Sequence, residues 1–307
     1  MGSKNPRRRI GALYFYGSFV INCLYKFFPA RAEFFDNFLL RASSKFSLND
    51  PFEATPSSNF WADLCIQLKY ERFGKTREEI IQYLNSQEER SPWAELGISL
   101  YREKGIVSLT ETKDNLLMWS HYAQNHTGMV VEFDTTHDFF TSKFATENND
   151  SLGKLNRVLY RKERLDKLGE QLMEPYFHKS DEWSYEKEHR LLLCIYSADI
   201  YLLPKSCEAK FINNNNVKKE KLIPFSDALY EVDKPIFSNI MQEPKCMPMY
   251  RVPSEAIISV TFGCRSAFEF IEAVKFKLKE NNMTNVKLFI STIDKADYRL
   301  RFTEAKI

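Results

Sequence analysis

The sequence predicts an α+β protein in which strands and helices are mixed along the chain instead of alternating strictly. A chain of 307 residues can form one large domain or two modest ones, with a sizeable core. Hydrophobic residues make up 44% of it and charged residues 27%, which is typical of a soluble globular protein. The 25 phenylalanines and 15 tyrosines favour a packed interior over disorder.

Charge and cysteine usage narrow the class of protein further. The net charge of +2 is too small to indicate a polyanionic partner. The six cysteines are scattered, without a close pair at metal-ligand spacing. We therefore expect reduced, mostly buried cysteines and a cytoplasmic protein.

The amino end, residues 1–23, is a basic and then apolar segment. Three arginines at 7–9 and the apolar run after them imitate a secretory signal. The tyrosines in this run and Lys26 favour the alternative, a first core strand within 13–28. No other segment has the ~20 apolar residues needed to cross a bilayer, so we expect no membrane partner.

Helices are expected where apolar residues recur three and four positions apart. These runs are 32–40, 60–84, 115–123, 163–177 and 268–280. Asp114 could cap the helix over 115–123, and one more helix is expected to start at Ser91 and Pro92.

Strands are expected in short runs rich in β-branched and aromatic residues. These runs are 13–28, 41–46, 105–110, 129–133, 157–160, 185–196, 256–262 and 286–291. Turn and polar residues mark turns or loops at 48–53, 125–128, 141–155 and 213–216. We divide the rest of the chain into a core over 24–200 and a carboxyl-terminal α/β extension over 201–307, packed on that core.

Two carboxylates at the start of the expected strand 185–196 could carry chemistry. Side chains two positions apart share a face of a strand, so Glu186, Glu188 and Arg190 should line one face and His189 the other. Like-charged neighbours tend to raise the pKa of one carboxylate, which suits acid–base work. The alternative is a solvated strand end with an internal ion pair.

Two further groups of residues could form a ligand site. Trp119 and Tyr122, with His121 between them, could form a stacking floor for a planar ring. Asn49 and Asp50 lie in a rigid turn that could present an amide and a carboxylate to a ligand. The alternatives are core packing and an ordinary turn.

Several common sites are absent from the sequence. With only 10 glycines there is no phosphate-binding glycine loop, and there is no nucleophile elbow or zinc-protease helix. The five histidines show no metal-binding pattern, so we expect no metal.

Four ordered motifs resemble a widespread bacterial domain family of unknown function, from about Leu24 to Tyr196. They are Leu-Tyr-Lys-Phe at 24–27, Leu-Asn-Asp-Pro-Phe-Glu at 48–53, Met-Trp-Ser-His-Tyr at 118–122, and Trp183 with Glu186, Glu188 and Arg190. That family is similar to the ADP-ribosyltransferase superfamily, because its late strand opens with a Glu-x-Glu element after an aromatic, Asn-containing cleft.

The resemblance implies a split mixed β-sheet core with surrounding helices and an NAD cleft. Glu188 looks like the glutamate that holds a ribose hydroxyl and stabilises positive charge, and Glu186 like the residue that orients or deprotonates the acceptor. Which of the two is primary stays open. The other implied site residues are Tyr25, Asn49, Asp50, Trp119, His121 and Tyr122 around NAD, and Arg190 paired with one glutamate. Tyr25 and Lys26 stand where the superfamily often has a His or Arg that contacts the ribose.

The first functional hypothesis is therefore an enzyme that moves ADP-ribose from NAD to a macromolecule, either protein or nucleic acid (DNA or RNA). Such enzymes in bacteria are often toxins or anti-phage effectors, so an antitoxin is a possible partner. A second hypothesis is a non-enzymatic module that binds a nucleotide or peptide. A third is a metal-assisted nuclease that uses the paired carboxylates.

Overall fold

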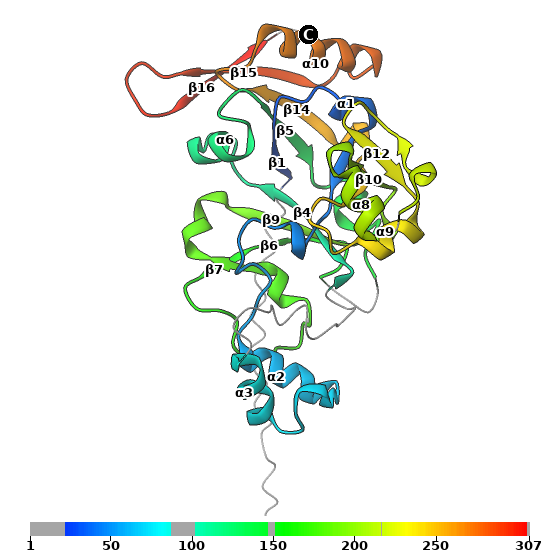
Figure 1. Ribbon diagram of the computed structural model, residues 1–307. Helices are drawn as coiled ribbons and strands as arrows, with labels where there is room; N and C mark the ends of the chain where they lie inside the picture. The colour runs from blue at the N-terminus through cyan, green and yellow to red at the C-terminus, as the bar shows by residue number, and fades with distance from the viewer. Residues whose placement is uncertain (1–21, 87–101, 147–150, 216, 306–307) are drawn as a thin grey trace, which may run out of the picture.

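The structure, a computed structural model, describes residues 22–86, 102–146, 151–215 and 217–305. Within these ranges the protein is a mixed α+β structure, as the sequence predicts, built around one large sheet (Figure 1). Along this sheet the strand order is β16-β15-β14-β5-β1-β4-β9-β6, with β3 beside β4. The pairing of β14 with β15 is parallel and that of β1 with β4 and β5 is antiparallel, so the sheet is mixed.

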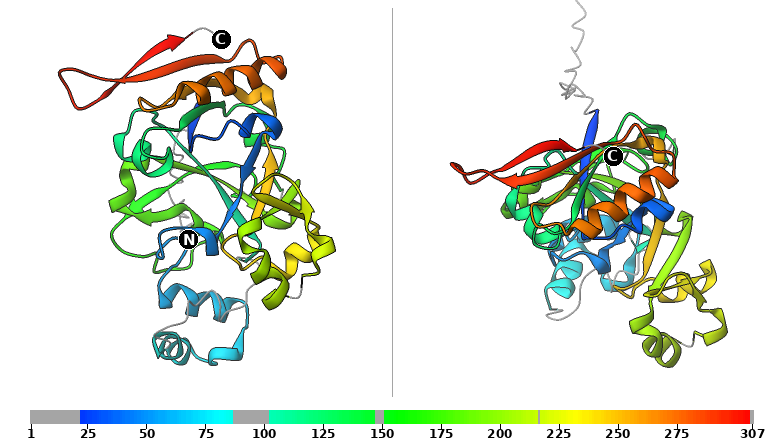
Figure 2. Two further views of the ribbon diagram at one scale, coloured as in Figure 1. Left: turned by 45° about the horizontal axis from the view of Figure 1, so that its top comes forward. Right: turned by 90° about the horizontal axis from the view of Figure 1, so that it is seen from above.

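The strands of the large sheet come from both ends of the chain. They are β1 (Cys23–Phe28), β3 (Ser43–Ser44), β4 (Lys104–Thr110), β5 (Met129–Asp134), β6 (Leu155–Arg157), β9 (Glu188–Cys194), β14 (Ile257–Phe262), β15 (Lys287–Ile293) and β16 (Leu300–Ala305). The hairpin of β15 and β16 projects from one end of the molecule (Figures 1 and 2).

Both faces of the large sheet are covered. Leu191 and Leu193 of β9 pack with α1 (Phe34–Asn37) and α10 (Phe268–Glu280), because side chains alternate along a strand. Leu192 points to the opposite face and joins a core formed with α2 (Ser58–Gln67) and α3 (Arg77–Ser86).

Farther along that opposite face, toward β1 and β5, α6 (Leu116–Tyr122) packs on Phe27 and Val130. One face of the sheet therefore carries two separate helical coverings, and the candidate site lies between them.

Residues after 200 contribute to both sheets. A second, five-stranded sheet has the order β11-β12-β10-β13-β2 and its own hydrophobic core. Its strands are β2 (Leu39–Arg41), β10 (Ile200–Pro204), β11 (Ile223–Pro224), β12 (Leu229–Val232) and β13 (Met247–Arg251), with helices α8 (Glu208–Asn215) and α9 (Lys234–Ile240). The remaining elements include α7 (Asp138–Thr141) and the two-stranded sheet of β7 (Leu159–Arg161) and β8 (His178–Ser180).

Several expected elements are confirmed. The helix over 268–280 has the predicted bounds, and strands β4, β5, β14 and β15 match their predicted runs to within two residues. The turn at 48–53 is also present, with Oδ1 of Asp50 accepting a 2.8 Å hydrogen bond from the amide of Phe52. No helix in the described ranges is long and apolar enough to span a membrane.

Other expectations were wrong, for identifiable reasons. The run 60–84 is two helices, broken near Gly74, whose φ of 148° favours glycine. The run 163–177 is irregular up to a short 3₁₀ helix (Glu174–Phe177), with the carbonyl of Leu165 bonded to the amide of Ser57. Residues 213–215 end α8 instead of forming a loop, since the buried Phe211 anchors that helix.

Two local details also differ. Asn115 caps α6 in place of Asp114, accepting hydrogen bonds from the amides of Leu117 and Met118. The run 157–160 spans the end of β6 and the start of β7 instead of forming one strand. The expectations for residues 13–21 and for a helix starting at Ser91 and Pro92 fall outside the described residues.

Candidate active site

A pocket of about 370 Å³ opens on the sheet face that carries α6, lined by this helix and by side chains from the segments 43–53 and 179–188. It lies where β1 meets β4: β1 pairs with β5 along six residues but with β4 at the single pair Tyr25 and Thr110. Its volume is in the range usual for small-molecule sites. Five residues from the sequence-based set line it: Tyr25, Asn49, Tyr122, Glu186 and Glu188.

The two glutamates reach this pocket by a route that the sequence did not predict. Strand β9 begins at Glu188, whereas 185 was expected, and the preceding Asp181–Glu186 is a 3₁₀ helix. Lys187 then takes a left-handed conformation, with φ of 44°. The expectation that Glu186 shares a strand face with Glu188 is therefore wrong, and the sharp turn at Lys187 brings the two carboxylates together instead.

Glu188 and Arg190 do share a face of β9, and they form a paired unit. Arg190 donates 2.8 Å hydrogen bonds from Nε and Nη2 to the two carboxylate oxygens of Glu188. It also donates to the carbonyl of Tyr176 and to the carboxylate of Glu53. Burial alone would raise the pKa of Glu188, but Arg190 and Lys179 outweigh burial and lower it to about 2. Glu188 is thus a fixed anion.

Lys179 of β8 lies at the centre of three carboxylates. Its Nζ is 2.6 Å from Oε2 of Glu186, 3.4 Å from Oε2 of Glu188 and 3.2 Å from Oε1 of Glu53. All four side chains are almost fully buried. A buried charge is stable only when it is paired, so this cation holds the carboxylates in place.

The pKa of Glu186 is shifted in the opposite direction from the pKa of Glu188. Burial raises its pKa, although Lys179 and the hydroxyl of Tyr122, which donates a 2.5 Å hydrogen bond to Oε1, pull the pKa down. Two neighbouring carboxylates with pKa values moved in opposite directions are a common basis for assigning different acid–base roles.

Lys26 adds a second cation to the pocket lining. Its Nζ donates a 2.9 Å hydrogen bond to the carbonyl of Ser108 on β4. Burial lowers its pKa to about 8, so its charge can change near neutral pH.

Four residues of the sequence-based set do not line the pocket. Trp119 is fully buried, donates from Nε1 to the carbonyl of Lys113 and packs edge-on against Phe27, which leaves Tyr122 as the stacking candidate. His121 is exposed. Asp50 shapes its turn, and Arg190 lies behind Glu188.

Sequence reasoning missed Lys179, Glu53 and Lys26 as site residues. Glu53 and Lys26 lie within the motifs at 48–53 and 24–27, so their charged side chains were a signal in the sequence. Lys179 had no signal, because it is one lysine among many and only the pairing of β7 with β8 turns it toward the glutamates.

The carboxylates do not form a metal cluster. No group of three His, Cys, Asp or Glu side chains in the described part of the chain could hold a metal ion. The oxygens of Glu53, Glu186 and Glu188 surround the ammonium group of Lys179 instead.

Comparison with known proteins gives one match. Residues 118–191 match the model of a family described as a protein of unknown function, DUF2971. This match supports the resemblance to a family of unknown function that the motifs indicated. The matched span runs from α6 to β9 and contains Tyr122, Lys179, Glu186, Glu188 and Arg190. No curated protein and no solved structure matches the chain.

Proposed function

We propose that this protein is an ADP-ribosyltransferase that moves ADP-ribose from NAD to a macromolecule. The observation that carries the proposal is the pocket itself. It collects Tyr25, Asn49, Tyr122, Glu186 and Glu188, which come from four separate segments, and the resemblance assigned all five to NAD binding and catalysis. The single residue pair between β1 and β4 at this point supports a split-sheet cleft of that superfamily.

The pocket lining suits parts of NAD. The ring of Tyr122 can stack on the nicotinamide, and the ammonium group of Lys26 can pair with the diphosphate. When bound, NAD supplies a ribose carbon whose bond to nicotinamide breaks, with the electron pair leaving on the nicotinamide nitrogen.

The two glutamates take different parts in this proposal. Glu188, ionised because Arg190 and Lys179 lower its pKa, stabilises the positive charge that develops on the ribose. Glu186 accepts the proton of the acceptor nucleophile while that nucleophile forms its new bond to the ribose carbon. Tyr122 positions Glu186, and Arg190 positions Glu188.

The competing functions fit the geometry less well. A metal-assisted nuclease needs carboxylate oxygens free to bind metal ions, whereas Lys179 and Arg190 engage the oxygens here. A binding module does not need two carboxylates whose pKa values are moved apart.

A toxin or anti-phage effector of the cytoplasm, silenced by an antitoxin, is the biological role that we propose with this activity.

The test is transfer of label from NAD carrying radioactive phosphate to a bacterial cell extract, followed by separate protease and nuclease digestion. Glu186→Gln should reduce labelling about 10²–10⁴-fold, because a general base contributes about that much. Glu269→Gln, on the exposed side of α10, is the matched control and should label normally. Normal turnover in both Glu186→Gln and Glu188→Gln would overturn the proposal, as would the absence of labelling by the unmodified protein.

A further inference from the structure

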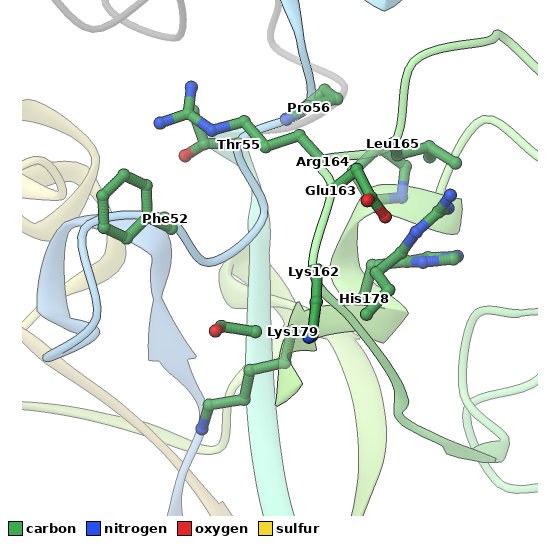
Figure 3. A pocket seen from close by; sticks show the side chains of 12 residues that line it. Phe52, Thr55, Pro56, Lys162, Glu163, Arg164, Leu165, His178 and Lys179 are labelled. Carbon is green, nitrogen blue, oxygen red and sulfur yellow. The ribbon is translucent and has the colours of Figure 1, made fainter. Parts of the chain in front are cut away.

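A second pocket, of about 240 Å³, adjoins the candidate active site, and Figure 3 shows the side chains that line it. Lys179 lines both pockets. The lining of the second pocket is basic, with Arg161, Lys162 and Arg164 opposed by the single carboxylate of Glu163.

The two-stranded sheet of β7 and β8 separates the two pockets. Tyr160 pairs in register with Lys179, and Arg161 pairs with Ser180. Tyr160 and Lys179 face the glutamates, since the Tyr160 hydroxyl accepts a 2.8 Å hydrogen bond from the amide of Glu188. Side chains alternate along a strand, so Arg161 and Ser180 face the second pocket. In Figure 3 the side chain of Lys179 accordingly runs away from Phe52 and Arg164.

The positive charge of this pocket is not neutralised locally. Residues 157–167 contain five basic and two acidic side chains. Among the described residues, Arg161, Lys162 and Arg164 form no ion pair. The carboxylate of Asp166 is occupied by hydrogen bonds from Ser57 and Asn59. Unpaired cations around a cavity attract an anionic ligand.

An aromatic ring lies beside these cations. Phe52 is 57% exposed, and the guanidinium carbon of Arg164 lies 4.9 Å from the centre of its ring (Figure 3). Nδ1 of His178, also in the lining, is buried and has no hydrogen-bond partner in the described part of the chain. A cationic groove with an exposed ring is the combination that binds single-stranded nucleic acids, with phosphates on the cations and a base on the ring.

We propose that this second pocket binds the phosphate backbone and one base of a single-stranded nucleic acid, and that this strand is the acceptor of ADP-ribose. The inference rests on the proposed transferase function and names its acceptor class. A single strand is required because a base within a duplex is stacked and cannot reach Phe52. Because Lys179 lines both pockets, a strand held here can continue past the β7–β8 sheet to the pocket that contains Glu186, the proposed base.

The test measures binding by fluorescence anisotropy without NAD, using a fluorescein-labelled single-stranded oligonucleotide of mixed sequence, made as DNA and as RNA. Phe52→Ala should weaken binding about 5- to 100-fold, because stacking of one base contributes that much. Replacing Arg161 and Arg164 by Gln should reduce the salt dependence of log K by about 0.7 for each lost phosphate contact. Lys279→Gln, an exposed lysine on the distant α10, is the matched control and should bind normally (Figure 1).

The outcomes separate this inference from the proposed function. Two results would overturn the inference and leave the transferase intact. In one, nuclease does not remove the label. In the other, the unmodified protein transfers label but binds no oligonucleotide. If the substitutions at Arg161 and Arg164 weaken binding of NAD but not of the oligonucleotide, the pocket belongs to the NAD diphosphate. This result also overturns the inference. Oligonucleotide binding that depends on Phe52 and Arg164, without transfer from NAD, supports the nucleic-acid site and overturns the transferase.

Discussion

The hydroxyl of Tyr122 lies 2.5 Å from Oε1 of Glu186 and joins α6 to the turn before β9, across 64 positions of the chain. Burial raises the pKa of Glu186, and this hydrogen bond opposes the effect of burial. Tyr122 therefore helps to set the pH at which Glu186 becomes a base. The same contact fixes the carboxylate within the pocket that both residues line.

Tyr122→Phe should move the acid limb of the pH–rate profile to higher pH. Without the hydroxyl, the pKa of Glu186 rises further, so less of it is ionised at a given pH. At pH values on this acid limb we expect transfer to fall about ten- to hundredfold, because a hydrogen bond to a charged group contributes about 1.5–3 kcal/mol. Tyr230→Phe, which removes a hydroxyl bonded to the distant Glu208, should leave the profile unchanged. An acid limb that stays in place in Tyr122→Phe would contradict the base role of Glu186.

Lys26 should make NAD binding depend on pH. Burial lowers its pKa to about 8, so the side chain is charged below pH 8 and loses its charge above it. Because NAD is anionic, its KM should rise as the pH passes through 8. In Lys26→Met the KM should be several-fold higher at pH 7 and should no longer change across this range. Steady-state kinetics between pH 6.5 and about 9.5 measure this, and a parallel rise in both proteins would exclude Lys26 as the cause.

Arg190 should be essential for stability. Arg190→Met leaves the buried carboxylates of Glu188 and Glu53 without this partner, and we expect a loss of about 3–5 kcal/mol in the free energy of unfolding. Denaturant titration followed by fluorescence provides the measurement. Arg301→Met, which removes an exposed partner of Asp294 while Arg299 still pairs with that carboxylate, should cost much less. Equal losses in the two variants would show that the buried network does not stabilise the fold.

Glu188 should contribute a pH-dependent part of stability. Folding lowers its pKa from the ordinary 4.5 to about 2, so its contribution is complete above pH 4.5 and is lost as the pH falls toward 2. The difference in unfolding free energy between the unmodified protein and Glu188→Gln should shrink by about 3 kcal/mol over that window. Denaturant titrations at several pH values test this, and a constant difference would contradict the ion pair with Arg190.

Local patterns predicted the elements whose signals lie within a few residues. Helix α10 has apolar residues at helical spacing, and β5 is a compact run of apolar, strand-favouring residues, so both were predicted with nearly correct bounds. No strand was predicted between 197 and 255, yet β10 to β13 lie there. These strands are short and depend on distant pairing, as when Met249 of β13 pairs with Arg41 of β2. Such pairing leaves no periodic trace in the sequence.

The sequence by itself determined which residue types could act and placed Glu188 beside Arg190, because a two-residue spacing on one strand is a local property. Only the tertiary structure decided the rest of the site. The turn at Lys187 brought Glu186 to Glu188, and the pairing of β7 with β8 placed Lys179 between them. Burial then raised the pKa of Glu186, whereas Arg190 and Lys179 outweighed burial and lowered that of Glu188, since the energy of a charge depends on surroundings that distant segments supply.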